Sequence, residues 1–158
     1  MFNTGIVTRR LTLVVLALLT GACQTVSPAG DQLPPPSISP PLEGTSWQLL
    51  RFQGGDDTIL RPDERAKYTL GFGPGGQLTV RVDCNRGRGT WTSSGPSQLR
   101  FGPLALTRAA CPAGSLHDHI VKQWSFIRSY VMRDGRLFLS LIADGGIYEF
   151  ERITGTGP

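Results

Sequence analysis

Cysteine, histidine and charged residues are scarce in this sequence of 158 residues, which has three cysteines, two histidines and 18% charged side chains. Three cysteines are too few for the dense disulfide framework of a small secreted scaffold. The 16 Lys and Arg residues nearly balance the 12 Asp and Glu residues. Because nucleic-acid-binding domains concentrate positive charge, we expect no nucleic acid among the partners of this chain.

Long hydrophobic runs are also missing. The longest extends from Leu11 to Leu19 and is interrupted by Thr12, whereas a membrane-spanning helix needs about 20 apolar residues. The chain is nevertheless 39% apolar, which is enough for a core, and it contains 20 Gly and 12 Pro. This composition favours one turn-rich domain with a high content of β-structure.

The first 22 residues have the organisation of a signal peptide. Two arginines at positions 9 and 10 precede the apolar run, and Gly21-Ala22 lies directly before Cys23. A basic start, a short apolar segment and small residues at the cleavage site are typical of exported proteins. The segment also resembles the bacterial lipobox, although Thr20 occupies the position where leucine is commonest. We therefore predict that Cys23 becomes the new N-terminus and carries lipid, including palmitate-type acyl chains.

The residue after the lipid site bears on localisation. Gln24 follows Cys23, where an aspartate retains many lipoproteins at the inner membrane. The lipobox resemblance therefore implies an anchor in the outer membrane, with the protein facing the periplasm. A plain signal peptide cleaved near Ala22 is the alternative, and it gives a soluble periplasmic or secreted protein.

Residues 23–42 form a proline-rich tether. Six prolines occur among the 19 residues from Gln24 to Leu42. Proline fixes φ and lacks an N–H group, so the segment favours an extended spacer over a helix or a sheet interior. The predicted folded domain, which we expect to be monomeric, spans residues 43–153, and residues 154–158 form a tail.

Alternation of apolar and polar residues predicts antiparallel strands. In the first strand, Trp47, Leu49 and Arg51 share one face and Phe52 lies on the other. Residues 68–72 and 77–82 form a hairpin around a Pro-Gly-Gly turn. Further predicted strands cover residues 90–92, 98–101, 130–132, 137–141 and 147–152, with the Asp134-Gly135 turn between the third and fourth segments of that series.

One segment has a helical period. Apolar residues recur at Leu116, Ile120, Trp124 and Ile127, and a capping signature starting at Ser115 precedes them. We expect one helix over residues 116–128, with Trp124 and Ile127 buried against the sheet.

Cys84 and Cys111 are the remaining cysteines. In an exported chain two such thiols usually pair, so we predict a structural disulfide. A redox pair is more often a closely spaced Cys-x-x-Cys, and a metal site requires more ligands. Two free, buried thiols remain the alternative.

No catalytic or metal site is predicted. His117 and His119 are two positions apart on a helix, so they point to different faces and cannot share a metal as neighbours. An exposed polar turn explains them. The sequence has no Gly-x-Ser-x-Gly elbow, and its carboxylates are scattered.

A glycine- and arginine-rich segment covers residues 85–89. Glycines let backbone N–H groups converge, and Arg86 and Arg88 complete a possible contact for an anion or a partner. Because no Lys-Ser/Thr follows and no helix begins there, the segment is not a nucleotide-binding loop. A tight turn with solvated arginines is the simpler interpretation.

Three ordered motifs point to a family. They are Gly44-Thr45-Ser46-Trp47, then Cys84-Asn85 with Gly89-Thr90-Trp91, and last Thr107-Arg108-Ala109-Ala110-Cys111. Together they resemble the META/HslJ domain over residues 42–152, with Trp91 and Ala109 replacing the usual Tyr and Met. The resemblance implies an α+β fold in which a curled antiparallel β-sheet, a partial barrel, packs on a single main helix.

The family resemblance also bears on function. It implies an envelope protein of the heat-shock HslJ type, linked to stress response and novobiocin resistance and without established enzyme activity. We therefore expect a non-catalytic lipoprotein that binds or supports an envelope protein partner and uses no cofactor. The alternative is a periplasmic inhibitor of a hydrolase such as lysozyme or a protease.

Overall fold

The computed structural model describes residues 42–155 of the chain. The predicted signal peptide, the predicted lipid site at Cys23 and all but the last residue of the predicted tether lie outside the described residues. Within the described range, no helix is long and apolar enough to cross a membrane.

Ten strands, one α-helix and four short 3-10 helices make up this range. The strands are β1 (Thr45–Gly54), β2 (Ile59–Leu60), β3 (Tyr68–Phe72), β4 (Gln77–Val82), β5 (Asn85–Thr92), β6 (Arg100–Phe101), β7 (Ala105–Leu106), β8 (Ile127–Arg133), β9 (Arg136–Leu141) and β10 (Gly146–Arg152). The helices are α1 (His117–Gln123), η1 (Arg65–Lys67), η2 (Pro74–Gly76), η3 (Trp124–Phe126) and η4 (Ile142–Asp144).

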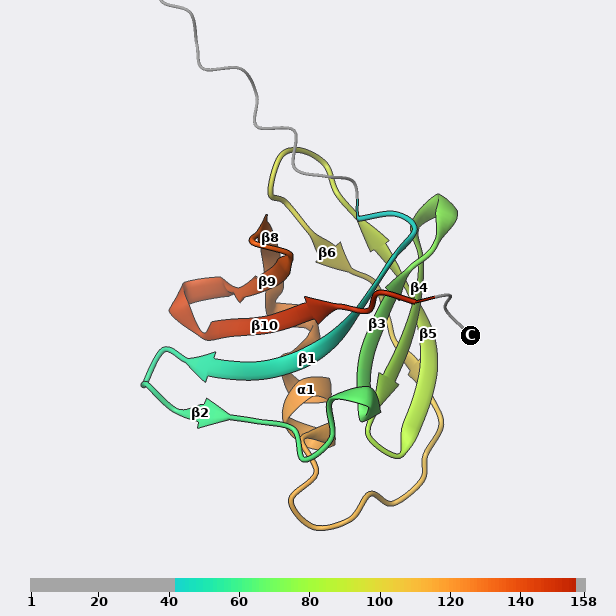
Figure 1. Ribbon diagram of the computed structural model, residues 1–158, viewed down its shortest axis with the longest axis vertical. Helices are drawn as coiled ribbons and strands as arrows, with labels where there is room; N and C mark the ends of the chain where they lie inside the picture. The colour runs from blue at the N-terminus through green and yellow to red at the C-terminus, as the bar shows by residue number, and fades with distance from the viewer. Residues whose placement is uncertain (1–41, 156–158) are drawn as a thin grey trace, which may run out of the picture. The chain divides into compact units, whose positions relative to one another are not determined.

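The strands form one antiparallel sheet that curls into a nearly closed barrel (Figure 1). Their order is β6-β5-β4-β3-β1-β10-β9-β8, while β2 adds to β1 and β7 adds to β5. The two ends of this order meet, because the Leu99 N–H donates to the Arg128 carbonyl and the Tyr130 N–H donates to the Ser97 carbonyl, at 3.0 and 2.8 Å. The predicted fold class, a curled antiparallel sheet packed on one main helix, is confirmed.

The core fills the inner face of this barrel. Its most deeply buried apolar side chains come from four strands, the segment before β1 and the segment before β6: Leu42, Trp47, Leu49, Phe72, Leu78, Leu99, Leu137 and Leu139. Leu42, which the sequence places at the end of the tether, is 2% exposed and packs in this core. The α-helix and η3 add Ile120 and Trp124 from the side facing the sheet.

A β-bulge corrects the predicted pattern of β1. Leu49 pairs with Phe150 and Arg51 with Glu149, so Leu50 is the extra residue of the bulge. Such an insertion reverses the alternation of side chains beyond it. Phe52 therefore enters the core, at 3% exposed, and Arg51 no longer shares the face of Trp47 and Leu49 as the alternation predicts.

The helix is shorter than its apolar period suggests. It ends at Gln123, η3 continues to Phe126, and Ile127 begins β8. Trp124 and Ile127 are buried as predicted, at 6% and 3% exposed. Ile127 reaches the core from a strand, because the backbone becomes extended at Ile127, directly after η3.

Candidate functional site

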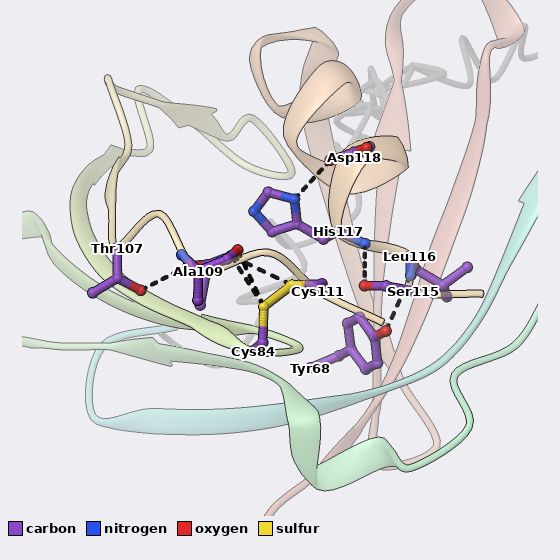
Figure 2. A network of polar contacts seen from close by, with 10 residues as sticks. Tyr68, Cys84, Thr107, Ala109, Cys111, Ser115, Leu116, His117 and Asp118 are labelled. Atoms are coloured by element: carbon purple, nitrogen blue, oxygen red, sulfur yellow. Dashed lines mark hydrogen bonds and ion pairs between the residues drawn. A yellow bond between two sulfur atoms is a disulfide. The ribbon is translucent and has the colours of Figure 1, made fainter. Parts of the chain in front are cut away.

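The Cys84–Cys111 disulfide joins the turn after β4 to the segment before α1 (Figure 2). The two Cα atoms are 5.4 Å apart, within the usual 4.4–6.8 Å range. The turn itself is made by Asp83, whose φ is 56°. The bond therefore fastens the approach to the helix onto the sheet.

Asn85 occupies the centre of this junction and is 1% exposed. Its Oδ1 accepts hydrogen bonds from the Thr107 hydroxyl and the Ala109 N–H, each 2.8 Å long. Its Nδ2 donates to the Ala109 carbonyl at 3.0 Å. With the disulfide of Cys84 and Cys111, these contacts form what we call the cystine clasp. Two of the three sequence motifs, Cys-Asn and Thr-x-x-Ala-Cys, thus meet in one structural unit.

The start of α1 is fixed by two further contacts (Figure 2). The Leu116 N–H donates to the Tyr68 hydroxyl at 3.0 Å, and the His117 N–H donates to the Ser115 hydroxyl at 3.1 Å. These bonds satisfy N–H groups that have no partner within the helix. Ser115 thus caps the helix through its hydroxyl, as its sequence position predicts. The N-cap residue itself is Leu116, whose side chain makes no capping hydrogen bond.

The two histidines of α1 make different contacts. His117 Nδ1 is 2.8 Å from an Asp118 carboxylate oxygen. The His119 ring packs edge-on against Phe52 with centroids 4.5 Å apart. Both histidines lie in α1 and are half-buried, so the predicted exposed turn is wrong for both. Burial, assisted by the charge of Lys122, lowers the pKa of His119. Among residues 42–155, no group of three or more His, Cys, Asp or Glu side chains could hold a metal ion.

Arg86 and Arg88 lie on a strand, which corrects the predicted turn. They occupy β5, where Arg86 pairs with Arg81 of β4 and Arg88 pairs with Thr79. Both arginines are exposed on the same face of β5. The glycine between them is required because a Cβ at Gly87 would collide with the Ala105 carbonyl of β7.

A second arginine cluster was not found by sequence reasoning. Its lining encloses about 290 Å³ on the outer face of the sheet and consists of Leu50, Arg51, Arg61, Arg65, Arg136 and Glu149. We call this the arginine hollow. The residues come from β1, the connection between β2 and η1, η1 itself, β9 and β10. The bulge at Leu50 turns both Leu50 and Arg51 toward this face.

Glu149 organises the arginine hollow. Its side chain is 5% exposed, and its carboxylate accepts hydrogen bonds from Arg51 Nε at 2.6 Å and from Arg136 Nη1. Burial alone would raise the pKa of Glu149, but the hydrogen bonds and charges of the two arginines outweigh it and lower the pKa. The carboxylate is therefore ionised at neutral pH and fixes both guanidinium groups.

Arg65 and Arg61 complete the lining. Arg65 Nη1 donates to Glu151 at 2.9 Å while its side chain remains 56% exposed. Arg61 is exposed and makes no ion pair within the described part of the chain. The arrangement can contact a negatively charged group, because fixed guanidinium groups present several N–H donors toward one space.

Comparisons with known proteins agree with this fold. A family model described as the META domain matches residues 40–153. A solved structure of a protein from Burkholderia xenovorans superimposes with a TM-score of 0.62 and 24% identity, covering 82% of this chain and 98% of that one. A DUF4847 family protein from Bacteroides vulgatus gives a TM-score of 0.51 and 14% identity, covering 68% and 92%. No curated protein matches the chain.

Proposed function

Because this chain belongs to the META domain family, we propose that it is a non-catalytic binding module of the bacterial cell envelope, held at the outer membrane by lipid on Cys23. Two observations support export and anchoring. The cystine clasp contains a disulfide, a bond that persists in oxidising compartments such as the periplasm. Cys23 follows a signal-peptide pattern. An association with envelope stress is the role that the family resemblance implies.

The arginine hollow carries the proposal of a binding role. An exposed arginine normally samples many rotamers, and fixing it costs conformational entropy. Here Arg51 and Arg136 are already held by a buried carboxylate. A partner that contacts them loses less entropy on binding, which is the advantage of a preorganised surface. The guanidinium groups of Arg51 and Arg136 thus face outward in a fixed arrangement. The packing of the core does not depend on this arrangement.

Crosslinking in intact cells tests the binding role. A partner should crosslink to the wild-type protein, and the yield should fall when Arg61 and Arg65 are both replaced by alanine. Replacing Arg86 and Arg88 with alanine removes the same charge from β5 and should leave the yield unchanged. Equal yields from all three proteins would contradict a binding role for the arginine hollow.

A separate assay distinguishes the inhibitor alternative. The purified protein, mixed at a stoichiometric concentration with lysozymes and proteases, should leave their rates unchanged. A stoichiometric loss of activity of one hydrolase would instead favour the inhibitor.

Lipidation at Cys23 gives a prediction about localisation. The wild-type protein should fractionate with the outer membrane, and mass spectrometry should find acyl mass on its mature N-terminus. Replacing Cys23 with serine should move the protein to the soluble fraction, since several acyl chains at about 0.8 kcal/mol per buried methylene make the anchor effectively permanent. An unmodified Cys23 in wild-type protein would end the lipoprotein interpretation.

A further inference from the structure

We propose that the arginine hollow is a binding site for an oxyanion, a phosphate or carboxylate group carried by the partner. This inference rests on the proposed binding function and names the chemistry that the site recognises. It assigns direct contact to Arg61 and Arg65, shared contact to Arg51 and Arg136, and a positioning role to Glu149.

The charges of the arginine hollow are unbalanced. Four guanidinium groups line it together with one carboxylate, that of Glu149. Glu151 adds one more acid through its ion pair with Arg65, so positive charges still exceed negative charges by two. Grouping like charges in one concave space raises the free energy of the unliganded protein. A bound anion relieves this repulsion.

The guanidinium groups retain donors for such an anion. An arginine has five N–H donors. The bonds to Glu149 occupy Nε of Arg51 and one donor of Arg136, while these two side chains remain 37% and 52% exposed. All the N–H donors of the Arg61 guanidinium group are available, because its side chain makes no hydrogen bond or ion pair among residues 42–155. Guanidinium forks match the geometry of phosphate and carboxylate oxygens, which they bind in a bidentate manner.

The volume of the arginine hollow limits the ligand. Its approximately 290 Å³ lie just below the range for small-molecule sites, and it is open to solvent, so it suits one charged group of a larger molecule that remains outside. Leu50, on the bulge of β1, supplies an apolar wall beside the arginines. The site therefore fits the acidic group of a larger molecule, such as a phosphorylated headgroup or an acidic side group.

Glu149 distinguishes this site from a loose cluster of surface arginines. Its carboxylate is almost completely buried and is held from two neighbouring strands, β1 and β9. Removing it should free Arg51 and Arg136 to adopt other rotamers. Glu149→Gln should thus weaken anion binding even though it removes a negative charge. Simple charge attraction predicts the opposite sign, so this variant separates positioning from bulk electrostatics.

Titration with inorganic phosphate tests the proposal. The mature chain with Cys23→Ser, at constant ionic strength, should show saturable shifts of backbone amide signals in β1, β9 and β10. The pair Arg61→Ala and Arg65→Ala should weaken binding about tenfold or more, since charge-assisted contacts are lost. The pair Arg86→Ala and Arg88→Ala is the matched control and should bind like wild type. The absence of saturable shifts, or equal affinity in the two double variants, would overturn the proposal.

Vesicles identify the source of the oxyanion. The protein is mixed with vesicles of phosphatidylglycerol and phosphatidylcholine, or with vesicles of phosphatidylcholine alone. Binding to the first kind only, lost in the double variant Arg61→Ala and Arg65→Ala, assigns the oxyanion to a lipid headgroup. Phosphate binding without vesicle binding assigns it to a soluble or polymeric partner. Both outcomes support the oxyanion site.

The two proposals can fail separately. A partner that crosslinks in a manner dependent on the arginine hollow, with no phosphate binding, would overturn the oxyanion inference and leave the binding module in place. Phosphate binding without such crosslinking would support the oxyanion site and contradict the proposed role in holding a partner.

Discussion

Replacing Trp124 with alanine should lower the free energy of unfolding by about 3–5 kcal/mol. The Trp124 side chain is 6% exposed and stacks on Phe101 with centroids 4.5 Å apart. Its indole N–H also donates to the Gly102 carbonyl at 3.1 Å. The substitution removes both contacts and leaves a cavity between η3 and β6. A loss of this size approaches the whole stability of a small domain.

Thermal unfolding measures this effect. At about 4 °C per kcal/mol for a domain of this size, Trp124→Ala should lower the Tm by more than about 12 °C. Phe126 lies two residues further along η3 and is 45% exposed, so Phe126→Ala is a matched control that should change the Tm little. Similar shifts for the two variants would show that the side of η3 facing the core is misassigned.

Removal of the disulfide has the second large expected effect. The bond spans 27 positions in the sequence, and the chain-entropy relation gives about 3.5 kcal/mol for a loop of that length. Replacing Cys84 and Cys111 with serine should therefore move the urea midpoint strongly downward. Asn85 should still hold Thr107 and Ala109, so we expect the variant to fold.

Thiol titration provides the direct check. The unfolded, unreduced Cys23→Ser chain should show no reactive thiol, and the same chain should show two after reduction. Adding a reductant to the double serine variant should not change its midpoint further. Two reactive thiols before reduction, in protein isolated from the periplasm, would refute the bond.

The elements that the sequence predicts well are those defined by neighbouring residues. The hairpin of β3 and β4 follows from strict alternation on both sides of Pro74-Gly75-Gly76, and the hairpin of β8 and β9 follows from Asp134-Gly135. In each case the turn and the pattern lie within one short segment. Local preferences and the final fold therefore agree.

The errors arise where distant segments decide the local structure. The bulge at Leu50 depends on pairing with β10, which is about 100 residues away in the sequence. Gly87 and Gly89 suggest a turn, but the structure uses them where the segment around β7 approaches β5 closely. Glycine has both uses, and the sequence alone does not distinguish them.

The arginine hollow is beyond the reach of sequence reasoning for the same reason. Arg51 and Glu149 are 98 positions apart, and their contact requires the β1–β10 register. Arg61 and Arg65 look like ordinary charges of a polar loop. By contrast, both halves of the cystine clasp are present as recognisable motifs, although the role of Asn85 between them becomes visible only in the structure.

The position of β1 in the sheet has a mechanical consequence. This strand begins three residues after Leu42 and pairs with β10 from Trp47 to Gly54 and with β3 from Thr45 to Gln48. A pull on its N-terminal end that is resisted by the neighbouring strands β3 and β10 acts along the strand. Ladder hydrogen bonds run across that direction, so they share the tension and must break together rather than one at a time. The first strand of the domain is thus suited to transmit force without unfolding.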